Sequence, residues 1–398
     1  MKRRSLFSGI LLLSLTVFGQ SQTENVLKEV EQNNTTLSAL RKNTESEMIG
    51  NKTDIFLQNP EIEFNYLWGN PVAIGNRTDF SIKQRFDFPT AYGYKKQISN
   101  LENDQAMLEY QKNLSTILFE TKLICNDLIF TNALQNELTK RFEHAQSIAQ
   151  SYKTKFNLGE TNVLEFNKAQ LNLLKMANAV ALNETERINL LAELTRMNGG
   201  KAIAFDESTF PEVSLAEDFD QWYNATKQQN PSLEWLKKEI EVSQRNIQLN
   251  RALNLPKFEA GFMTEEVIGE QFRGVTAGMV LPLWENKNKV KAAKSSAITI
   301  ESMAADHELQ FYNHLKALHS KAVRLQKNAA DYKSGLLLYN NAELLKTALD
   351  KGEIALINYL TELSFYYESM HQLLEIEKEL FKVVAEIERF GEGATLAN

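Results

Sequence analysis

Cysteine is nearly absent from this chain, because Cys125 is the only one among 398 residues. One cysteine excludes an intramolecular disulfide and a zinc site made of cysteines. Proline and glycine are also scarce, at 7 and 17 residues, and both residues interrupt helices. The composition therefore favours long unbroken helices, which are held in place by packing or by assembly with other chains.

The sequence also lacks the patterns that mark an enzyme or a metal site. It has no G-x-S-x-G, no phosphate-binding loop and no evident nucleophile with its base. His307, His314 and His319 fall on one predicted helix, but no two of them have the i, i+4 spacing of a helical zinc pair. We interpret them as solvated or groove-packing residues. The sequence therefore predicts a protein that is not an enzyme and that has no cofactor and no bound metal.

Long apolar runs are missing after the N-terminus, and positive charge is not in excess. Residues 1–19 combine Lys2, Arg3 and Arg4 with a short apolar core, which predicts a secretory signal peptide cut near Gly19. An uncleaved anchor is the alternative, but a membrane-spanning helix needs about 20 apolar residues. No cysteine follows the core, so no lipid-modified N-terminus is expected. The net charge of −7 argues against a nucleic-acid partner.

What the chain does contain is an internal duplication. Landmarks of the first half recur in the same order in the second half, at an offset of roughly 195 residues, which is far longer than the repeats of solenoids and propellers. The paired landmarks are Asn34 and Asn230, Pro60 and Pro256, Phe88-Pro89 and Leu281-Pro282, Gly159 and Gly352, and Glu160 and Glu353. We predict a signal peptide at 1–19, a first repeat at 20–200, a connecting equatorial segment at 201–229, a second repeat at 230–390 and a flexible tail at 391–398.

Each repeat combines helices with one β-hairpin. Apolar residues at helical spacing predict helices at 23–57, 92–157 and 162–197, and at 230–253, 286–350 and from Gly352 to about 390. Strict alternation of apolar and polar residues predicts hairpins at about 60–89 and 256–282. A helix of some sixty residues is a rod of about 100 Å, and we expect the two shorter helices of each half to stack end to end beside it. Such rods need neighbours from other chains to bury their apolar stripes.

The alternation in the hairpins suits a membrane-spanning barrel. We predict that one face contacts lipid through Phe64, Tyr66, Trp68, Phe80, Phe258 and Phe262. The other face is predicted to line an aqueous lumen through Glu63, Asn65, Lys83 and Arg85. Four strands are too few to close a barrel and a membrane does not tolerate open edges, so the barrel must be shared between chains. The alternative is a small four-stranded sheet packed on a soluble core.

Taken together, these features resemble the TolC family of outer-membrane efflux channels over essentially the whole mature chain. The resemblance rests on the duplicated hairpins closed by Phe88-Pro89 and Leu281-Pro282, and on the duplicated helical turns at Gly159 and Gly352. It implies a mainly α-helical fold with a β-barrel portion, in which a homotrimer forms a twelve-stranded outer-membrane barrel that continues as a periplasmic α-helical coiled-coil tunnel. The implied function is a passive exit duct of a tripartite efflux system. Its implied partners are outer-membrane lipid, a periplasmic adaptor protein and an inner-membrane pump of the resistance-nodulation-division type.

The resemblance also assigns roles to the region farthest from the hairpins. The residues expected to form the tunnel tip and to dock the adaptor are Gly159, Glu160, Gly352 and Glu353. Family members often carry aspartates after the second turn, where this sequence has Asn358 and Thr361, while the first repeat has Glu165. We expect these three positions to form a tunnel constriction whose negative charge is reduced.

The cargo stays open at the level of sequence. Asn59-Pro60-Glu61-Ile62 is similar to the CzcC-like components of heavy-metal efflux systems, which suggests heavy-metal ions or small toxic compounds. A type I protein-secretion duct of the same family is the first alternative, because a wide aqueous lumen imposes little chemistry on what passes. A soluble periplasmic coiled-coil adaptor or scaffold is the second. Adaptors normally carry one helical hairpin between β-rich domains, and the duplication argues against them.

Overall fold

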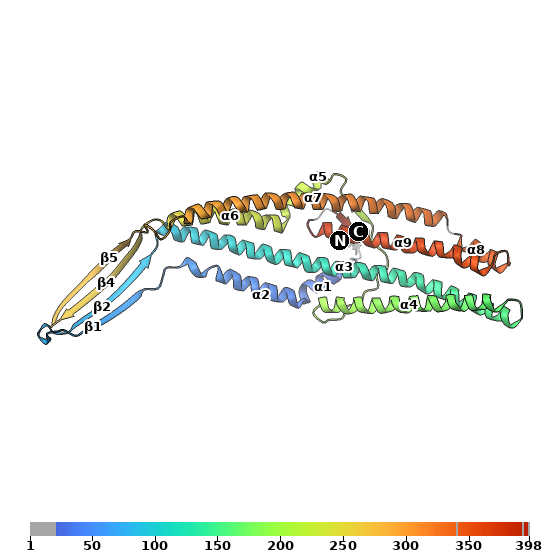
Figure 1. Cartoon of the computed structure of the whole chain (residues 1–398), viewed down its shortest axis with the longest axis horizontal. Coiled ribbons are helices and arrows are strands. Elements are labelled where there is room, and N and C mark those ends of the chain that lie inside the picture. Colours follow the sequence, from blue (N-terminus) through green and yellow to red (C-terminus); the bar gives the residue numbers. More distant parts are fainter. Residues whose placement is uncertain (1–20, 340, 392–393, 397–398) are drawn as a thin grey trace, which may run out of the picture.

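The structure, a computed structural model, describes residues 21–339, 341–391 and 394–396. It is a long rod with a β-sheet at one end and helical turns at the other (Figure 1). The predicted signal peptide at 1–19 lies outside the described residues.

Both halves of the chain combine helices with two long strands. The first half contains α1 (Gln22–Asn33), α2 (Thr35–Gly50), β1 (Glu61–Leu67), β2 (Arg77–Phe86), α3 (Pro89–Asn157) and α4 (Val163–Met197). The second half contains α5 (Phe219–Gln229), α6 (Pro231–Ala252), β4 (Lys257–Val267), β5 (Glu270–Val280), α7 (Lys289–Leu338), α8 (Ala342–Asp350) and α9 (Leu356–Glu388). The short elements are η1 (Thr53–Ile55), η2 (Val72–Ile74), β3 (Val213–Leu215) and β6 (Ala394–Leu396).

Two helices that the sequence predicted as continuous are divided. The prediction of one helix at 23–57 is wrong because Asn34 has an extended backbone, and its side-chain oxygen accepts a 2.9 Å hydrogen bond from the Leu37 N–H. Asn34 therefore ends α1 and caps α2. The predicted helix at 286–350 is interrupted between α7 and α8, near Gly335 and Asn341, two residue types that disfavour helix interiors.

The asparagines that cap α2 and α6 also join helices that lie end to end. Asn34 Nδ2 donates a 2.8 Å hydrogen bond to the carbonyl of Met197, the last residue of α4. Asn230 Nδ2 donates a 3.4 Å hydrogen bond to the carbonyl of Phe390, just beyond α9. Each half thus places two shorter helices beside a long one, α4 and α2 beside α3, and α9 and α6 beside α7 (Figure 1). The predicted end-to-end stacking is confirmed.

We expect the Asn34 junction to contribute measurably to stability. Asn34→Ala removes a helix cap, worth about 1 kcal/mol, and leaves a carbonyl at a buried junction without its donor, which adds roughly 1–2 kcal/mol. Asn34→Asp keeps the capping oxygen and loses only the donor, so it should cost less than Asn34→Ala. Urea unfolding followed by circular dichroism measures both variants. An Asn34→Asp variant as stable as the parent would contradict the role of the bond to Met197.

The two hairpins form one antiparallel sheet with the strand order β1-β2-β4-β5. They are joined side by side, since β2 pairs with β4 from Arg77 opposite Val267 to Phe86 opposite Phe258. β1 and β5 lie at the edges, and neither has a second partner strand among the described residues. β1 is exposed along its whole length, so the alternative of a small sheet packed on a soluble core is not what the structure shows.

The buried side chains lie between the helices. One cluster joins Val30 of α1, Leu128 and Ile129 of α3, and Leu194 of α4. Cys125 belongs to this cluster, where burial raises the pKa of its thiol to about 12. The thiol therefore stays protonated and unreactive at neutral pH. No helix in the described ranges is both long enough and apolar enough to cross a membrane.

The end of the chain differs in part from the predicted flexible tail at 391–398. Ala394–Leu396 forms strand β6, which pairs antiparallel with β3 in the connecting segment. A short strand such as β3 offers an unpaired edge, and a chain end that reaches it can satisfy its backbone hydrogen bonds there.

Candidate functional site

One face of the sheet carries a ladder of ion pairs. The strand register places Glu63 opposite Ser81, and Arg85 opposite Glu259. Lys83 pairs with Glu63 at 3.4 Å, and Arg85 pairs with Glu259 at 2.7 Å and with Glu61 at 3.2 Å. Asn65 joins the ladder by donating to Glu63 at 3.1 Å. The four residues predicted to line the lumen therefore share one face, and three of them carry charges that are paired across strands.

The opposite face of the sheet is largely apolar, and much of it is exposed. Phe64 lies directly opposite Phe80, and Ile82 lies opposite Phe262. The Phe64 side chain is 65% exposed, and Ile82 and Phe262 are also exposed. Exposed apolar side chains on this scale are rare on a protein surface that meets only water. All six residues predicted to contact lipid follow the alternation of this face, with Trp68 just beyond the end of β1.

Exposed tryptophans stand just beyond the sheet at each of its two ends. Trp68 is 80% exposed and packs edge-on against Tyr66, with ring centroids 5.6 Å apart. Trp284, beyond the far end of β5, is equally exposed. Exposed tryptophans at the two ends of an apolar strand face match the aromatic girdles of membrane barrels.

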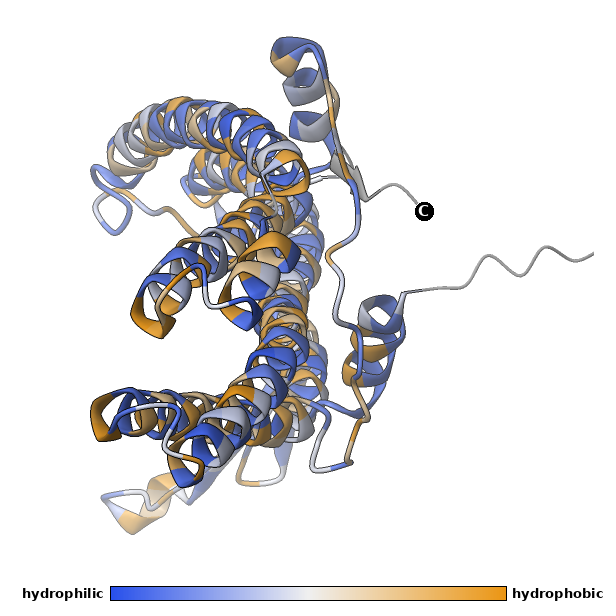
Figure 2. Ribbon diagram, turned by 90° about the vertical axis from the view of Figure 1, so that its right-hand side faces the viewer, coloured by the Kyte–Doolittle hydropathy of each residue, from blue (hydrophilic) through white to orange (hydrophobic). Residues whose placement is uncertain are grey.

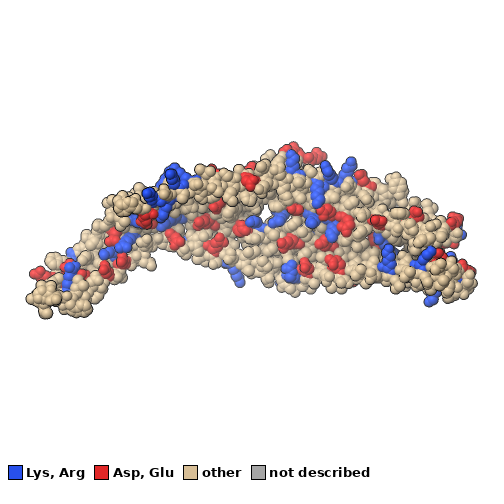
Figure 3. Space-filling view, viewed as in Figure 1, with Lys and Arg blue, Asp and Glu red and all other residues tan. Residues whose placement is uncertain are grey.

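The helices form a curved wall rather than a closed bundle. Seen from the end that carries the helical turns, they lie along an arc (Figure 2). Residues of both charges are mixed along the side of the rod, and neither sign dominates a large area of that view (Figure 3). An open arc of helices is the shape expected of one segment of a larger ring.

The two helical turns at the far end repeat each other in atomic detail. Gly159 and Gly352 have positive φ angles of 76° and 72°, which glycine adopts without strain. Glu160 N–H donates to the Lys155 carbonyl at 2.8 Å, and Glu353 N–H donates to the Ala348 carbonyl at 2.9 Å. These bonds complete the same C-terminal cap on α3 and on α8. The four predicted tip residues thus lie at the same end of the rod, opposite the sheet (Figure 1).

The three predicted constriction residues have different surroundings. Glu165 lies in the first turn of α4, forms a 2.9 Å ion pair with Lys168 and is half-buried. Asn358 and Thr361 are exposed on the first turns of α9. Thr361 lines a groove between α3, α4 and α9. The carboxylate of Glu165 is therefore partly neutralised within its own chain, whereas the α9 positions are open.

The seam between α3 and α9 holds two side chains that the sequence reasoning missed. His144 Nε2 and the hydroxyl of the fully buried Tyr359 are 2.8 Å apart. Arg141 donates at 3.1 Å to the Tyr367 carbonyl and stacks over the Tyr367 ring, with Cζ 4.2 Å from the centroid. Their partners are more than 200 residues away in the chain, so no local spacing points to these contacts.

The His144 contact should weaken in acid. Burial, followed by the charge of Lys346, lowers the pKa of His144, while Asp350 acts in the opposite direction. The unfolded state then binds the proton more readily than the folded state, so this contribution is present above about pH 6.5 and is lost below it. We expect faster hydrogen exchange in Leu356–Leu363 at pH 5.5 than at pH 7.5, after correction for intrinsic exchange.

The control for this pH effect is a pair of histidine variants. His144→Gln should remove most of the additional exchange at acid pH, whereas His307→Gln, at an exposed position on α7, should leave it unchanged. The assignment fails if His307→Gln flattens the pH dependence as much as His144→Gln does.

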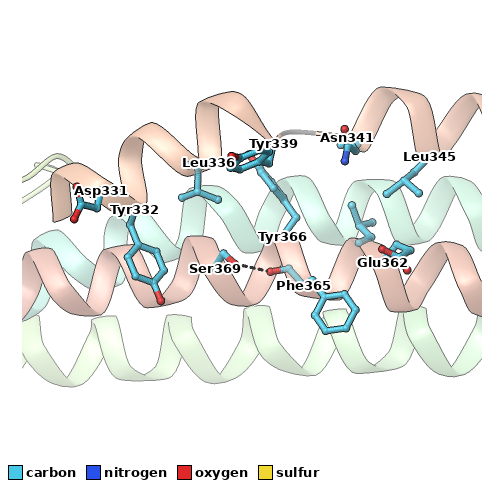
Figure 4. A pocket seen from close by; sticks show the side chains of 13 residues that line it. Asp331, Tyr332, Leu336, Tyr339, Asn341, Leu345, Glu362, Phe365, Tyr366 and Ser369 are labelled. Atoms are coloured by element: carbon cyan, nitrogen blue, oxygen red, sulfur yellow. Dashed lines mark hydrogen bonds between the residues drawn. The ribbon is translucent and has the colours of Figure 1, made fainter. Parts of the chain in front are cut away.

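The interruption between α7 and α8 opens a second groove, with a volume of about 540 Å³. Tyr332 and Leu336 of α7 and Leu345 of α8 line the groove together with Phe365 and Tyr366 of α9 (Figure 4). Leucine and aromatic side chains share the lining of this groove with Asp331, Asn341, Glu362 and Ser369.

Solved structures of outer-membrane channels share this architecture. The CmeC outer membrane channel of Campylobacter jejuni superposes with a TM-score of 0.74 over 95% of this chain and 87% of its own, at 14% identity. The outer-membrane channel OprN gives 0.77 over 93% and 89%, at 12% identity. The outer membrane protein VceC of Vibrio cholerae gives 0.74 over 94% and 96%, at 10% identity. The chain has the TolC fold.

The likeness is one of structure and not of sequence. No protein-family model matches the chain, and a search of curated proteins finds no match. The predicted mainly helical fold, with a helical tunnel portion and a barrel portion, is confirmed as the TolC fold. Among the described residues, no group of three or more His, Cys, Asp or Glu is placed to hold a metal ion.

Proposed function

We propose that this protein is the outer-membrane exit duct of a tripartite efflux system and works as a homotrimer. The observation that carries the proposal is the sheet, which exposes an apolar face, an ion-paired polar face and two edge strands that have no second partner among the described residues. In water such a sheet is unstable and prone to aggregate. In a shared barrel, β1 of one copy pairs with β5 of the next, the apolar face meets lipid and the charged face meets water.

The helical wall supports the same assembly. Three arcs placed around one axis close a tunnel that continues the barrel into the periplasm, and the duplicated turns at Gly159 and Gly352 then surround its mouth. We propose that Glu160 and Glu353, beside these turns, lie on the rim that docks the periplasmic adaptor. An inner-membrane pump of the resistance-nodulation-division type supplies the energy, because a passive duct performs no chemistry of its own.

Fractionation and mass determination test the proposal. The protein should stay with outer membranes after carbonate and salt washes and should be released by detergent as a particle with the mass of three chains. A soluble adaptor or scaffold washes off under the same conditions. A stable monomer without detergent would overturn the proposal, because a single chain leaves the apolar face of the sheet in water.

The cargo proposal is heavy-metal ions or small toxic compounds, and it rests on the Asn59-Pro60 strand entry and on the compact chain. A strain lacking this protein should become sensitive to zinc, cobalt or cadmium salts, or to small organic toxicants. Loss of a secreted protein, with unchanged resistance to both classes of compound, would favour the alternative of a type I secretion duct.

A further inference from the structure

The groove between α3, α4 and α9 has the size and lining of a ligand site. Its volume is about 630 Å³, within the range of roughly 300–1,000 Å³ that small-molecule pockets occupy. Leu138 and Ala145 of α3, Met176 of α4 and Leu363 of α9 belong to the apolar half of its lining, and the other half is polar or charged. The lining comes from three helices of one chain, so the groove exists before any assembly.

Arg141 stands in this groove and forms no ion pair with any described residue. Its Nη2 donates to the Tyr367 carbonyl and its guanidinium stacks on the Tyr367 ring. Arg141 Nε is buried and has no hydrogen-bond partner among the described residues. Glu137, one helical turn before Arg141, is paired with Lys140. A half-buried guanidinium with an unused N–H donor is a strong site for a carboxylate or another oxyanion.

Lys175 adds a second positive charge to the groove, against one carboxylate. Lys175 reaches the groove from α4, is exposed and forms no ion pair with any described residue. Glu368 is the only carboxylate of the lining. With Arg141 and Lys175 against one carboxylate, the groove carries net positive charge in a chain whose net charge is −7.

We propose that this groove binds an amphipathic organic anion, with its carboxylate on Arg141 and Lys175 and its apolar body on the lining around Met176. An inorganic anion would leave the apolar lining in water, and an organic cation would be repelled by the two basic groups. The plainer reading is that Arg141 only ties α3 to α9. The two interpretations predict different results. If Arg141 only holds α3 against α9, the binding of a small molecule in the groove should not depend on the charge of that molecule.

Photolabelling with 4-benzoylbenzoate tests the site directly. This probe has an apolar benzophenone body and one carboxylate, and its excited ketone inserts readily into methionine C–H bonds, so Met176 is a built-in acceptor. The full-length protein in detergent is irradiated with the probe at pH 7.5, and adducts are mapped by peptide mass spectrometry. We expect the main adduct in the α4 peptide that contains Met176, and about tenfold less of it with the neutral methyl ester of the probe.

Variants separate charge recognition from folding. Arg141→Gln should reduce labelling by the acid about tenfold and should leave labelling by the methyl ester unchanged. Lys175→Gln, at an exposed position whose side chain forms no ion pair with the described residues of α3 or α9, should reduce labelling by the acid several-fold, and it serves if Arg141→Gln does not fold. Arg245→Gln, an exposed arginine on α6, is the matched control and should label like the parent.

Two results would overturn the proposal. Equal labelling by acid and ester, or acid labelling that neither Arg141→Gln nor Lys175→Gln reduces, would leave Arg141 with a structural role only. The readout is on the protein itself, so it does not depend on the proposed duct function.

Discussion

Phe64→Arg should nearly abolish assembled protein in the outer membrane, whereas Asn65→Arg should be tolerated. The two residues are neighbours in β1, but they face opposite sides of the sheet. An arginine on the lipid side near the bilayer midplane destabilises a membrane barrel by about 2–4 kcal/mol. A trimer carries the substitution three times. On the polar side, Asn65→Arg meets water and the carboxylate of Glu63.

The Phe64 comparison is decisive because Phe64 packs little within its own chain. Its side chain is 65% exposed, so in a water-exposed sheet Phe64→Arg should be harmless or even favourable. The amount of detergent-resistant trimer in outer membranes, compared for the two variants and the parent, measures the effect. Equal tolerance at both positions would show that the apolar face is not a lipid boundary.

Asn358→Asp combined with Thr361→Asp should make the tunnel strongly cation-selective. Both positions are exposed on α9, and in a trimer the double variant adds six carboxylates to one level of the tunnel. The parent should be weakly cation-selective and weakly blocked by multivalent cations, because Glu165 is paired with Lys168 within each chain. Single-channel recordings in planar bilayers compare the two forms.

The structure refines this prediction in one respect. Thr361 lines the same groove as Arg141 and Lys175, so the carboxylate of Thr361→Asp is partly compensated by those charges. Asn358→Asp alone should therefore give most of the gain in selectivity. Close carboxylates raise one another's pKa values, so the gain should fade on acidification. A double variant that conducts like the parent at neutral pH would mean that these positions do not line the constriction.

The elements that the sequence predicted best are those with long and regular patterns. The alternation on either side of Phe64 and Phe80 marks strands because side chains in a strand point to opposite faces in turn. The helix α3 was predicted within a few residues, since nothing in its interior breaks the apolar periodicity. The turns at Gly159 and Gly352 were found through duplication, because only glycine adopts their backbone angles without strain.

The errors fall where a single side chain decides the outcome. Asn34 divides α1 from α2 by capping α2. The apolar pattern around it would look the same if Asn34 lay inside one continuous helix. Its hydrogen bond to Met197 joins positions that are 163 residues apart, and local spacing carries no information about such a contact. The interruption between α7 and α8 was missed because the residues around it, such as Gly335 and Asn341, disfavour a helix only weakly.

The sequence by itself determined the repeated architecture, the two faces of the hairpins and the glycine turns, because periodicity and backbone conformation are local properties. Only the tertiary structure decided that the two hairpins form one open sheet, that asparagines join the stacked helices, and that Arg141 lies in a groove where it pairs with no described carboxylate. Those features depend on which distant segments come together, and that choice is made by the packing of the whole chain.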